Sequence, residues 1–287
     1  MDSNRPIIAA VDGSDESMQA LRWAAHVAAG SNRALLVVSV VGLAVSGRPT
    51  TSIDAQARLL LAMRTAAERA VDRGVRIAAD TAPAVRVTGE VLEGYPALAL
   101  RGISARAHLM VLGRRGLGGV KGLLLGSVST DVAAHAECPV VLVSGPMPNE
   151  GEVVVGIDTS PLAREAARLG FAMADALGAS VRAVHAYGTV PERVLDDSGT
   201  YEELLRTQAE ELISEQCAGL RADYPDLTFT SQVAAQTPSR LLVDAARDAR
   251  LVVLGSRGRG GFRGLLLGST GQAVAQVARC PVMIVHG

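Results

Sequence analysis

The sequence has few aromatic residues and almost no excess of charge of either sign. Phe, Trp and Tyr make up 3% of its 287 residues, and the formal net charge at pH 7 is -1. Nucleic-acid binding commonly relies on basic surfaces, which contact the phosphates, and on aromatic side chains, which stack on the bases. The composition therefore argues against a nucleic-acid partner.

Long hydrophobic runs and closely spaced cysteines are also absent. The first residues, MDSNRPIIAAVDG, lack the basic region and apolar core of a signal peptide, and the apolar runs of the chain have the length of strands. Cys138, Cys217 and Cys280 lie far apart, with no CxxC spacing. This pattern predicts a cytoplasmic protein without a membrane span, a disulfide framework or a structural zinc site.

The chain contains an internal repeat. The segment LGRRGLGGVKGLLLGSVS at 112–129 returns as LGSRGRGGFRGLLLGSTG at 254–271, and twelve of these eighteen positions are identical. IIAAVDGS likewise has a counterpart in VVVGIDTS, and CPVVLV has one in CPVMIV. Repetition on this scale predicts a duplicated domain. We predict domain 1 at 1–146, a linker with loop-forming residues at 147–151, and domain 2 at 152–287.

Short apolar runs alternate with helix-length amphipathic segments in each half. Apolar runs without polar alternation are typical of strands buried on both faces, as in a parallel sheet covered by helices. The sequence therefore predicts an α/β protein with two tandem, doubly wound, Rossmann-like domains of five parallel strands each. In domain 1 we predict strands near 6–12, 34–40, 84–88, 108–113 and 139–143, and helices near 16–29, 53–73, 95–105 and 127–136. In domain 2 we predict strands near 152–158, 180–186, 228–233, 250–255 and 281–285, and a helix near 200–220.

Each repeated glycine segment begins where an apolar strand ends and finishes at Gly-Ser before a predicted helix. Its fixed points follow the pattern G-x2-G-x9-G-S. We predict that the first two glycines form tight turns with positive φ, that backbone without Cβ lets phosphate approach, and that the helix N-terminus attracts an anion. The predicted phosphate-binding residues are Gly113, Gly116, Gly126 and Ser127 in domain 1, and Gly255, Gly258, Gly268 and Ser269 in domain 2.

Three different roles for the glycine segments fit the sequence less well. A glycine-rich surface loop without a ligand is one alternative, but the spacing is the same in both halves. The P-loop pattern GxxxxGK[ST] does not occur. The dinucleotide pattern GxGxxG is absent from the first strand-to-helix turns, which read DGSDES and DTSPLA. P-loop NTPase activity and NAD or FAD binding are therefore not expected.

Taken together, these motifs resemble the universal stress protein family in its tandem, ATP-binding form, which is marked by G-x2-G-x9-G-[ST]. The resemblance covers nearly the whole chain and implies an adenine nucleotide alpha hydrolase-like fold. It also implies one adenine nucleotide per domain, bound as ATP with magnesium. Asp12 and Asp158 would lie beside adenine and ribose, and the backbone near Val38 and Val184 would hold adenine. For the two aspartates, helix N-capping is the alternative role and is compatible with the first.

Residues that flank these motifs complete the predicted nucleotide sites, and some differ between the halves. Arg114 stands where the second copy has Ser256, so the first site gains a cation that pairs with phosphate or points into water. Ser129 is replaced by Gly271, which removes a phosphate donor from the second site. The two sites are therefore expected to differ in affinity. The added site residues are Gly13, Arg114, Val128 and Ser129 in domain 1, and Ser256 and Thr270 in domain 2.

No catalytic constellation emerges from the remaining side chains, because the five histidines show no HExxH or other paired spacing. We therefore expect a regulatory ATP-binding protein of the stress response, whose ligand state changes its conformation or association, and not an enzyme. A slow ATPase and an interaction scaffold with vestigial sites are the alternatives. The resemblance further implies that CPVVLV and CPVMIV pair the two halves as a pseudo-dimer. It also implies a homodimer of chains, and an unidentified protein partner is a further possibility.

Overall fold

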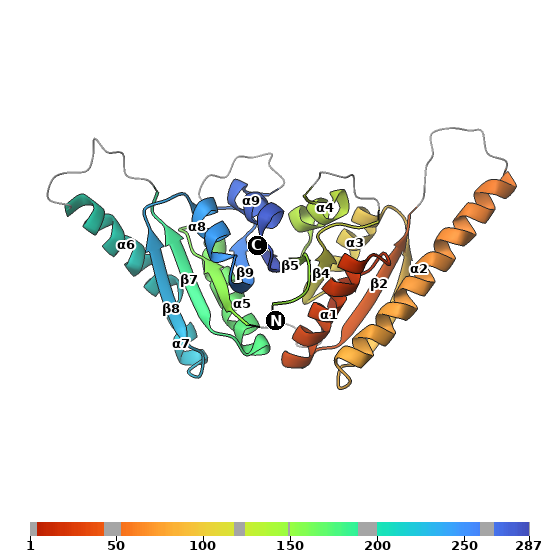
Figure 1. The fold of residues 1–287 in the computed structure, drawn as a ribbon, viewed down its shortest axis with the longest axis horizontal. Helices are drawn as coiled ribbons and strands as arrows, with labels where there is room; N and C mark the ends of the chain where they lie inside the picture. Colours follow the sequence, from red (N-terminus) through yellow and green to blue (C-terminus); the bar gives the residue numbers. More distant parts are fainter. Residues whose placement is uncertain are drawn as a thin grey trace. The chain divides into compact units, whose positions relative to one another are not determined.

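The computed structural model describes residues 5–42, 53–117, 124–148, 150–188, 200–258 and 267–286. The chain divides into two compact units, 1–144 and 145–287 (Figure 1). Each unit is an α/β fold whose strands pair in parallel. The predicted fold class is confirmed.

Unit 1 has five parallel strands in the order β3-β2-β1-β4-β5. β2 and β3 lie on one side of β1, and β4 and β5 lie on its other side. The right-handed crossovers that connect parallel strands therefore place α1 and α2 on one face of the sheet and α3 and α4 on the other face. The elements are β1 (Ile7–Ala10), α1 (Asp15–Gly30), β2 (Leu35–Val41), α2 (Ile53–Thr81), β3 (Val87–Glu93), α3 (Pro96–Ser104), β4 (Leu109–Gly113), α4 (Ser127–His135) and β5 (Val140–Val143).

Unit 2 repeats this arrangement, with strand order β10-β9-β6-β7-β8. Between β7 and β8 it has a short additional helix. The elements are β6 (Glu152–Gly156), α5 (Pro161–Leu177), β7 (Val181–Ala186), α6 (Thr200–Gln216), α7 (Leu220–Asp223), β8 (Phe229–Ala234), α8 (Pro238–Ala245), β9 (Ala249–Gly255), α9 (Ser269–Val277) and β10 (Val282–Val285).

The cores are built from the apolar strands that the sequence indicates. All four residues of β5 and all four of β10 are buried, as are the five residues of β4. Side chains on both faces of these strands are covered, which accounts for the lack of polar alternation in their sequences. In each unit, the strand order reverses beside the first strand, so a crevice opens at the carboxyl ends of β1 and β4 and of β6 and β9.

Some boundaries differ from the prediction because α2 does not end at residue 73. It continues to Thr81 through Gly74, and β3 consequently begins at Val87, three residues later than predicted. A Cβ on Gly74 would lie 2.9 Å from Val37 Cγ1 and 3.2 Å from Leu21 Cδ2. Glycine at this position therefore permits close helix–sheet packing and does not stop the helix. The predicted helix at 200–220 is likewise divided into α6 and α7.

The three cysteines all lie in the described part of the chain, are buried, and form no disulfide. Burial raises the pKa of Cys138 to about 12 and that of Cys217 to about 11. Both thiols therefore stay protonated near neutral pH, which is characteristic of inert core cysteines. Among the described residues, no helix combines the length and the apolar character needed to cross a membrane.

Candidate functional site

The turn after β1 is organised by Asp12 and Ser14. Ser14 is the N-cap of α1, and its hydroxyl oxygen accepts a hydrogen bond from the Ser17 amide at 3.2 Å. Asp12 Oδ1 accepts from both the amide and the hydroxyl of Ser14, at 3.0 and 2.6 Å. The capping role proposed as the alternative for Asp12 therefore belongs to Ser14, which the aspartate positions. In unit 2, Asp158 Oδ1 accepts from the amide of the N-cap Ser160 at 2.9 Å.

Asp12 also joins this turn to the glycine segment. Its Oδ2 accepts a hydrogen bond from the Leu117 amide at 2.7 Å, across 105 residues of sequence. Partial burial raises the pKa of Asp12, but hydrogen bonds from Ser14, Leu117 and Ser17 outweigh burial and hold this pKa below its ordinary value. The carboxylate therefore remains ionised and acts as an acceptor at the end of β1.

The second glycine of each motif makes room for the aspartate. A Cβ on Gly116 would collide with Asp12 Oδ2, and a Cβ on Gly258 would lie 2.7 Å from Asp158 Oδ2. Both separations are too short for a carbon and an oxygen that are not bonded. The aspartate and the glycine, which the sequence presents as separate motifs, are thus one structural unit in each half.

The prediction that the motif glycines have positive φ is wrong. None of Gly113, Gly116, Gly255 and Gly258 adopts the left-handed region. Steric contact accounts for them instead, since a Cβ on Gly113 would lie 3.1 Å from the Ser17 nitrogen, and one on Gly255 would lie 3.0 Å from Leu162 Cβ. These glycines allow the end of the strand to approach the first turn of the neighbouring helix.

A positive φ occurs instead in the first turn of unit 1, at Gly13, where φ is 91°. Thr159 takes this place in unit 2 without a positive φ. The threonine is therefore accommodated by a different turn conformation, with no left-handed strain. Gly13 does not line the cavity beside this turn.

The third glycine of each motif begins a helix whose N-terminus has no side-chain cap. Gly126 is the N-cap of α4 and Gly268 that of α9, and glycine has no side chain with which to bond the first amides. The first N–H groups of an α-helix have no partner within the helix, and the helix dipole makes this end attractive to anions. Ser127 and Ser269 add a hydroxyl at the first helical position.

These elements surround a cavity of about 540 Å³ in unit 1. Most of the residues that the sequence predicts for the site line it. They are Asp12, Val38, Gly113, Gly116, Gly126, Ser127, Val128 and Ser129. An apolar part of the lining was not predicted from the sequence, and it is contributed by Val40, Val41, Met63, Ala66, Pro96, Leu100 and Leu125.

A cavity of about 410 Å³ occupies the equivalent place in unit 2. The predicted residues that line it are Asp158, Val184, Gly255, Gly258, Gly268, Ser269 and Thr270. Pro238, Leu241, Leu242 and His185 complete its apolar side without having been predicted. His185 is buried, and its Nδ1 donates a hydrogen bond to the Ile157 carbonyl at 2.7 Å, which is a structural role within the sheet.

Among the described residues, the arginines that line the two cavities are Arg115 and Arg257, whereas the predicted Arg114 does not line either of them. Arg114 and its counterpart Ser256 lie outside both linings. Their amides donate to the Val143 and Val285 carbonyls, at 2.8 and 2.7 Å. The sequence contained a signal for the correct arginines, because GRRG and GSRG both have arginine at their third position and only GRRG has it at the second.

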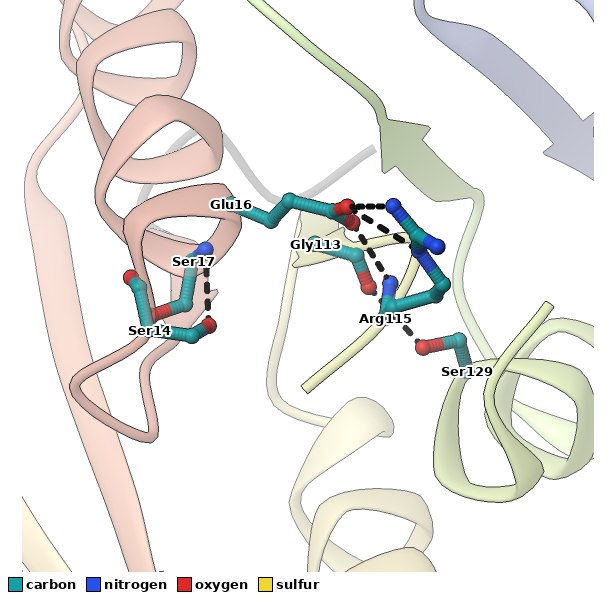
Figure 2. A network of polar contacts seen from close by, with 6 residues as sticks. All are labelled: Ser14, Glu16, Ser17, Gly113, Arg115 and Ser129. Atoms are coloured by element: carbon teal, nitrogen blue, oxygen red, sulfur yellow. Dashed lines mark hydrogen bonds and ion pairs between the residues drawn. The ribbon is translucent and has the colours of Figure 1, made fainter. Parts of the chain in front are cut away.

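Two further predicted roles change in the structure. The Ser129 hydroxyl donates to the Gly113 carbonyl at 2.9 Å, so its proton already has an acceptor within unit 1 (Figure 2). The carbonyls of Val38 and Val184 accept from the Val11 and Ile157 amides, at 2.8 and 2.9 Å. The pairing of β2 with β1 ends at Val38. Because residues two positions apart in a strand have the same orientation, the backbone groups of Val40 point the same way as those of Val38 but lie beyond the part of β2 that pairs with β1.

Comparison with known proteins places the chain among its relatives. It matches the universal stress protein family over residues 3–144 and again over residues 151–286. It is 34% identical over 301 residues to Universal stress protein Rv1996 of Mycobacterium tuberculosis, covering 98% of this chain and 95% of that protein. It is 35% identical over 286 residues to Universal stress protein Rv2005c of the same organism, covering 97% and 96%.

Solved structures agree on the fold. The crystal structure of a universal stress protein from Archaeoglobus fulgidus superposes with a TM-score of 0.72 at 20% identity, covering 99% of this chain and 96% of that one. Two family domains therefore account for nearly all of the sequence, and the relatives align with it over nearly their whole length. The chain belongs to the universal stress protein family.

Proposed function

We propose that this protein is a regulatory ATP-binding protein with one nucleotide site in each unit. The observation that supports this best is the recurrence of one arrangement in both units. In each, an aspartate lies in the turn after the first strand, a glycine segment follows the fourth, and an uncapped helix N-terminus faces the same cavity. Parallel α/β folds bind ligands at this edge of the sheet.

The cavities fit an adenine nucleotide in size and in the distribution of polar groups. Ligand pockets of about 300–1,000 Å³ are typical for small molecules, and both cavities fall in that range. One side is apolar, with Met63 and Leu100 in unit 1 and Leu241 and Leu242 in unit 2. Other lining residues contribute backbone amides and serine hydroxyls, among them those of Ser127 and Ser269. A nucleotide suits such a lining, because its planar base favours apolar contacts and its phosphates need hydrogen-bond donors.

Each part of the nucleotide then has a partner in unit 1. Adenine would lie on the apolar side and bond the backbone at Val40, because the Val38 carbonyl is already used. Asp12 would accept hydrogen bonds from ribose hydroxyls, since its lowered pKa keeps it ionised. The amides of Ser127 and Val128 would donate to phosphate oxygens at the N-terminus of α4. The phosphates would bring magnesium with them as the ATP complex.

Regulation fits the site better than catalysis. Phosphoryl transfer generally requires a group that orients the attacking water, together with positioned cations. The described lining of unit 1 has one carboxylate, and that carboxylate is hydrogen-bonded to Ser14 and Leu117. We propose that nucleotide binding changes conformation or association during the stress response. The predicted pairing of CPVVLV with CPVMIV and the predicted homodimer belong to this proposal.

The first experiment is to denature freshly purified protein and identify the released nucleotide by chromatography and mass spectrometry. We expect adenine nucleotide at up to two molecules per chain, and calorimetric titration of nucleotide-free protein with Mg-ATP should reach the same stoichiometry. Phosphate release under the same conditions would identify a slow ATPase. Protein that neither retains nor takes up adenine nucleotide would refute the proposal and favour a scaffold.

A further inference from the structure

The two cavities share an arginine but differ in the residue that faces it. Arg115 in unit 1 and Arg257 in unit 2 both follow the fourth strand and line their cavities. The first turn of the neighbouring helix presents Glu16 in unit 1 and Leu162 in unit 2. The charge of the side chain beside the glycine segment therefore differs between the units, because glutamate is ionised near neutral pH and leucine is uncharged.

In unit 1, Glu16 engages Arg115 by three hydrogen bonds (Figure 2). Its Oε1 accepts from Nε and an Nη of Arg115 at 3.1 and 2.7 Å, and its Oε2 accepts from the Arg115 amide at 2.9 Å. The side chain of Glu16 is only 24% exposed. The carboxylate thus neutralises the guanidinium and also occupies a backbone donor of the glycine segment.

In unit 2, no carboxylate on the neighbouring helix takes the place of Glu16. The first turn of α5 contains no acidic residue, whereas that of α1 contains Asp15 and Glu16. No ion pair or side-chain hydrogen bond joins Arg257 to another residue of the described ranges. Within the described residues, the guanidinium and the amide of Arg257 therefore have no competing carboxylate of the kind that Glu16 supplies in unit 1.

An anionic ligand meets opposite conditions in the two cavities. In unit 1, a phosphate group that approaches Arg115 must compete with Glu16 and is repelled by its charge. In unit 2, the equivalent phosphate meets an arginine whose planar donors match its oxygens. In the proposed binding mode the adenine lies on the apolar part of the cavity, so the difference in charge acts mainly on the phosphate tail.

We propose that Glu16 is a specificity-determining residue that makes the first cavity select adenine ligands with fewer phosphate charges than the second cavity. Unit 1 then favours a nucleoside or monophosphate, and unit 2 favours the triphosphate. This inference rests on the proposed function, because it assumes that both cavities bind adenine nucleotides.

A photoaffinity competition experiment measures each cavity separately in the full chain. The protein is labelled with 8-azido-ATP, and labelled peptides of units 1 and 2 are quantified by mass spectrometry while ATP, AMP or adenosine competes. We expect the ratio of ATP affinity to adenosine affinity to be about tenfold lower in unit 1, as for one charge-assisted contact in a solvated site.

Reciprocal exchange tests the cause. Glu16→Leu should raise the ATP-to-adenosine ratio of unit 1 about tenfold, and Leu162→Glu should lower that of unit 2 by a similar factor, with adenosine affinity unchanged in both. Glu16→Gln removes the charge but keeps an acceptor for the Arg115 amide, so it isolates the electrostatic part. Glu165→Gln is the matched control, since Glu165 pairs with Arg168 on α5 and is not among the described residues that line the unit 2 cavity.

The outcomes separate the inference from the proposed function. If both units are labelled but the ratios agree within twofold, or if neither exchange alters them, the role of Glu16 is refuted while the nucleotide sites stand. If neither unit is labelled and no competitor binds, the proposed nucleotide sites fail, and the inference fails with them.

Discussion

Gly116→Ala tests the link between the glycine segment and Asp12. The added Cβ would collide with Asp12 Oδ2, so the carboxylate must move and give up its 2.7 Å bond from the Leu117 amide. A hydrogen bond to a charged group contributes about 1.5–3 kcal/mol. Replacing glycine by alanine outside the left-handed region recovers about 0.4–1 kcal/mol through the unfolded chain. The expected net loss of stability is therefore about 0.5–2.6 kcal/mol.

The same displacement should weaken nucleotide binding in unit 1, because Asp12 would no longer lie at the end of β1. We expect about a tenfold loss of ATP affinity at that site, which corresponds to about 1.4 kcal/mol, and unchanged binding in unit 2. Urea unfolding monitored by circular dichroism gives the stability, and calorimetric titration gives the affinity of each site.

Gly102→Ala supplies the control for both measurements. Gly102 lies in α3, has no positive φ, and a Cβ there would meet nothing within 4 Å. Alanine at this position should stabilise the protein by about 0.5–1 kcal/mol and leave ATP binding unchanged. If Gly116→Ala proves as stable as Gly102→Ala and binds ATP with wild-type affinity, the steric argument is refuted.

Individual contacts support three further predictions. Gly74→Ala should destabilise unit 1 by about 1–3 kcal/mol in urea unfolding, because its Cβ would press on Val37; a gain in stability would contradict this packing. Folding lowers the pKa of Asp12, so the ionised carboxylate should stabilise the native chain relative to Asp12→Asn. This difference in the free energy of unfolding should be full above about pH 4 and disappear as the pH falls through the lowered pKa. A difference in stability that does not change between about pH 2 and 6 would oppose this. Cys138 and Cys217 should react with a thiol reagent at about pH 8 only after unfolding, because burial raises both pKa values; rapid labelling of the native chain would argue against their burial.

Some features of the site had a local signal that was interpreted wrongly. The repeated spacing of glycines marked the right segment, but the reason given, a positive φ, holds at none of Gly113, Gly116, Gly255 and Gly258. A motif shows that a side chain is excluded without showing what excludes it. Arg114 was chosen for its difference between the halves, whereas Arg115, which is the same in both copies, lines the cavity. The direction of a side chain after a strand depends on where the strand ends.

Some features of the fold and the cavities had no local signal. Met63 and Leu100 belong to the apolar periodicity of their helices, and nothing in that pattern distinguishes a cavity wall from a closed core. The extension of α2 through Gly74 was also hidden, because glycine commonly ends helices. Glycine is needed at position 74 because Val37, which belongs to β2, lies very close to the helix there.

The sequence by itself determined the duplication, the class of fold and the place of both glycine segments, because repeats, buried apolar runs and turn residues are properties of neighbouring positions. Only the tertiary structure decided which distant groups meet. Asp12 bonds Leu117 across 105 residues, and Glu16 bonds Arg115 across 99. Both contacts exist because β1 and β4 are adjacent in the sheet, which brings the turns after these strands together. Because the first and fourth strands are adjacent in each unit, Glu16 and Leu162 lie in the turns beside the cavity arginines, and the two similar cavities therefore differ in charge.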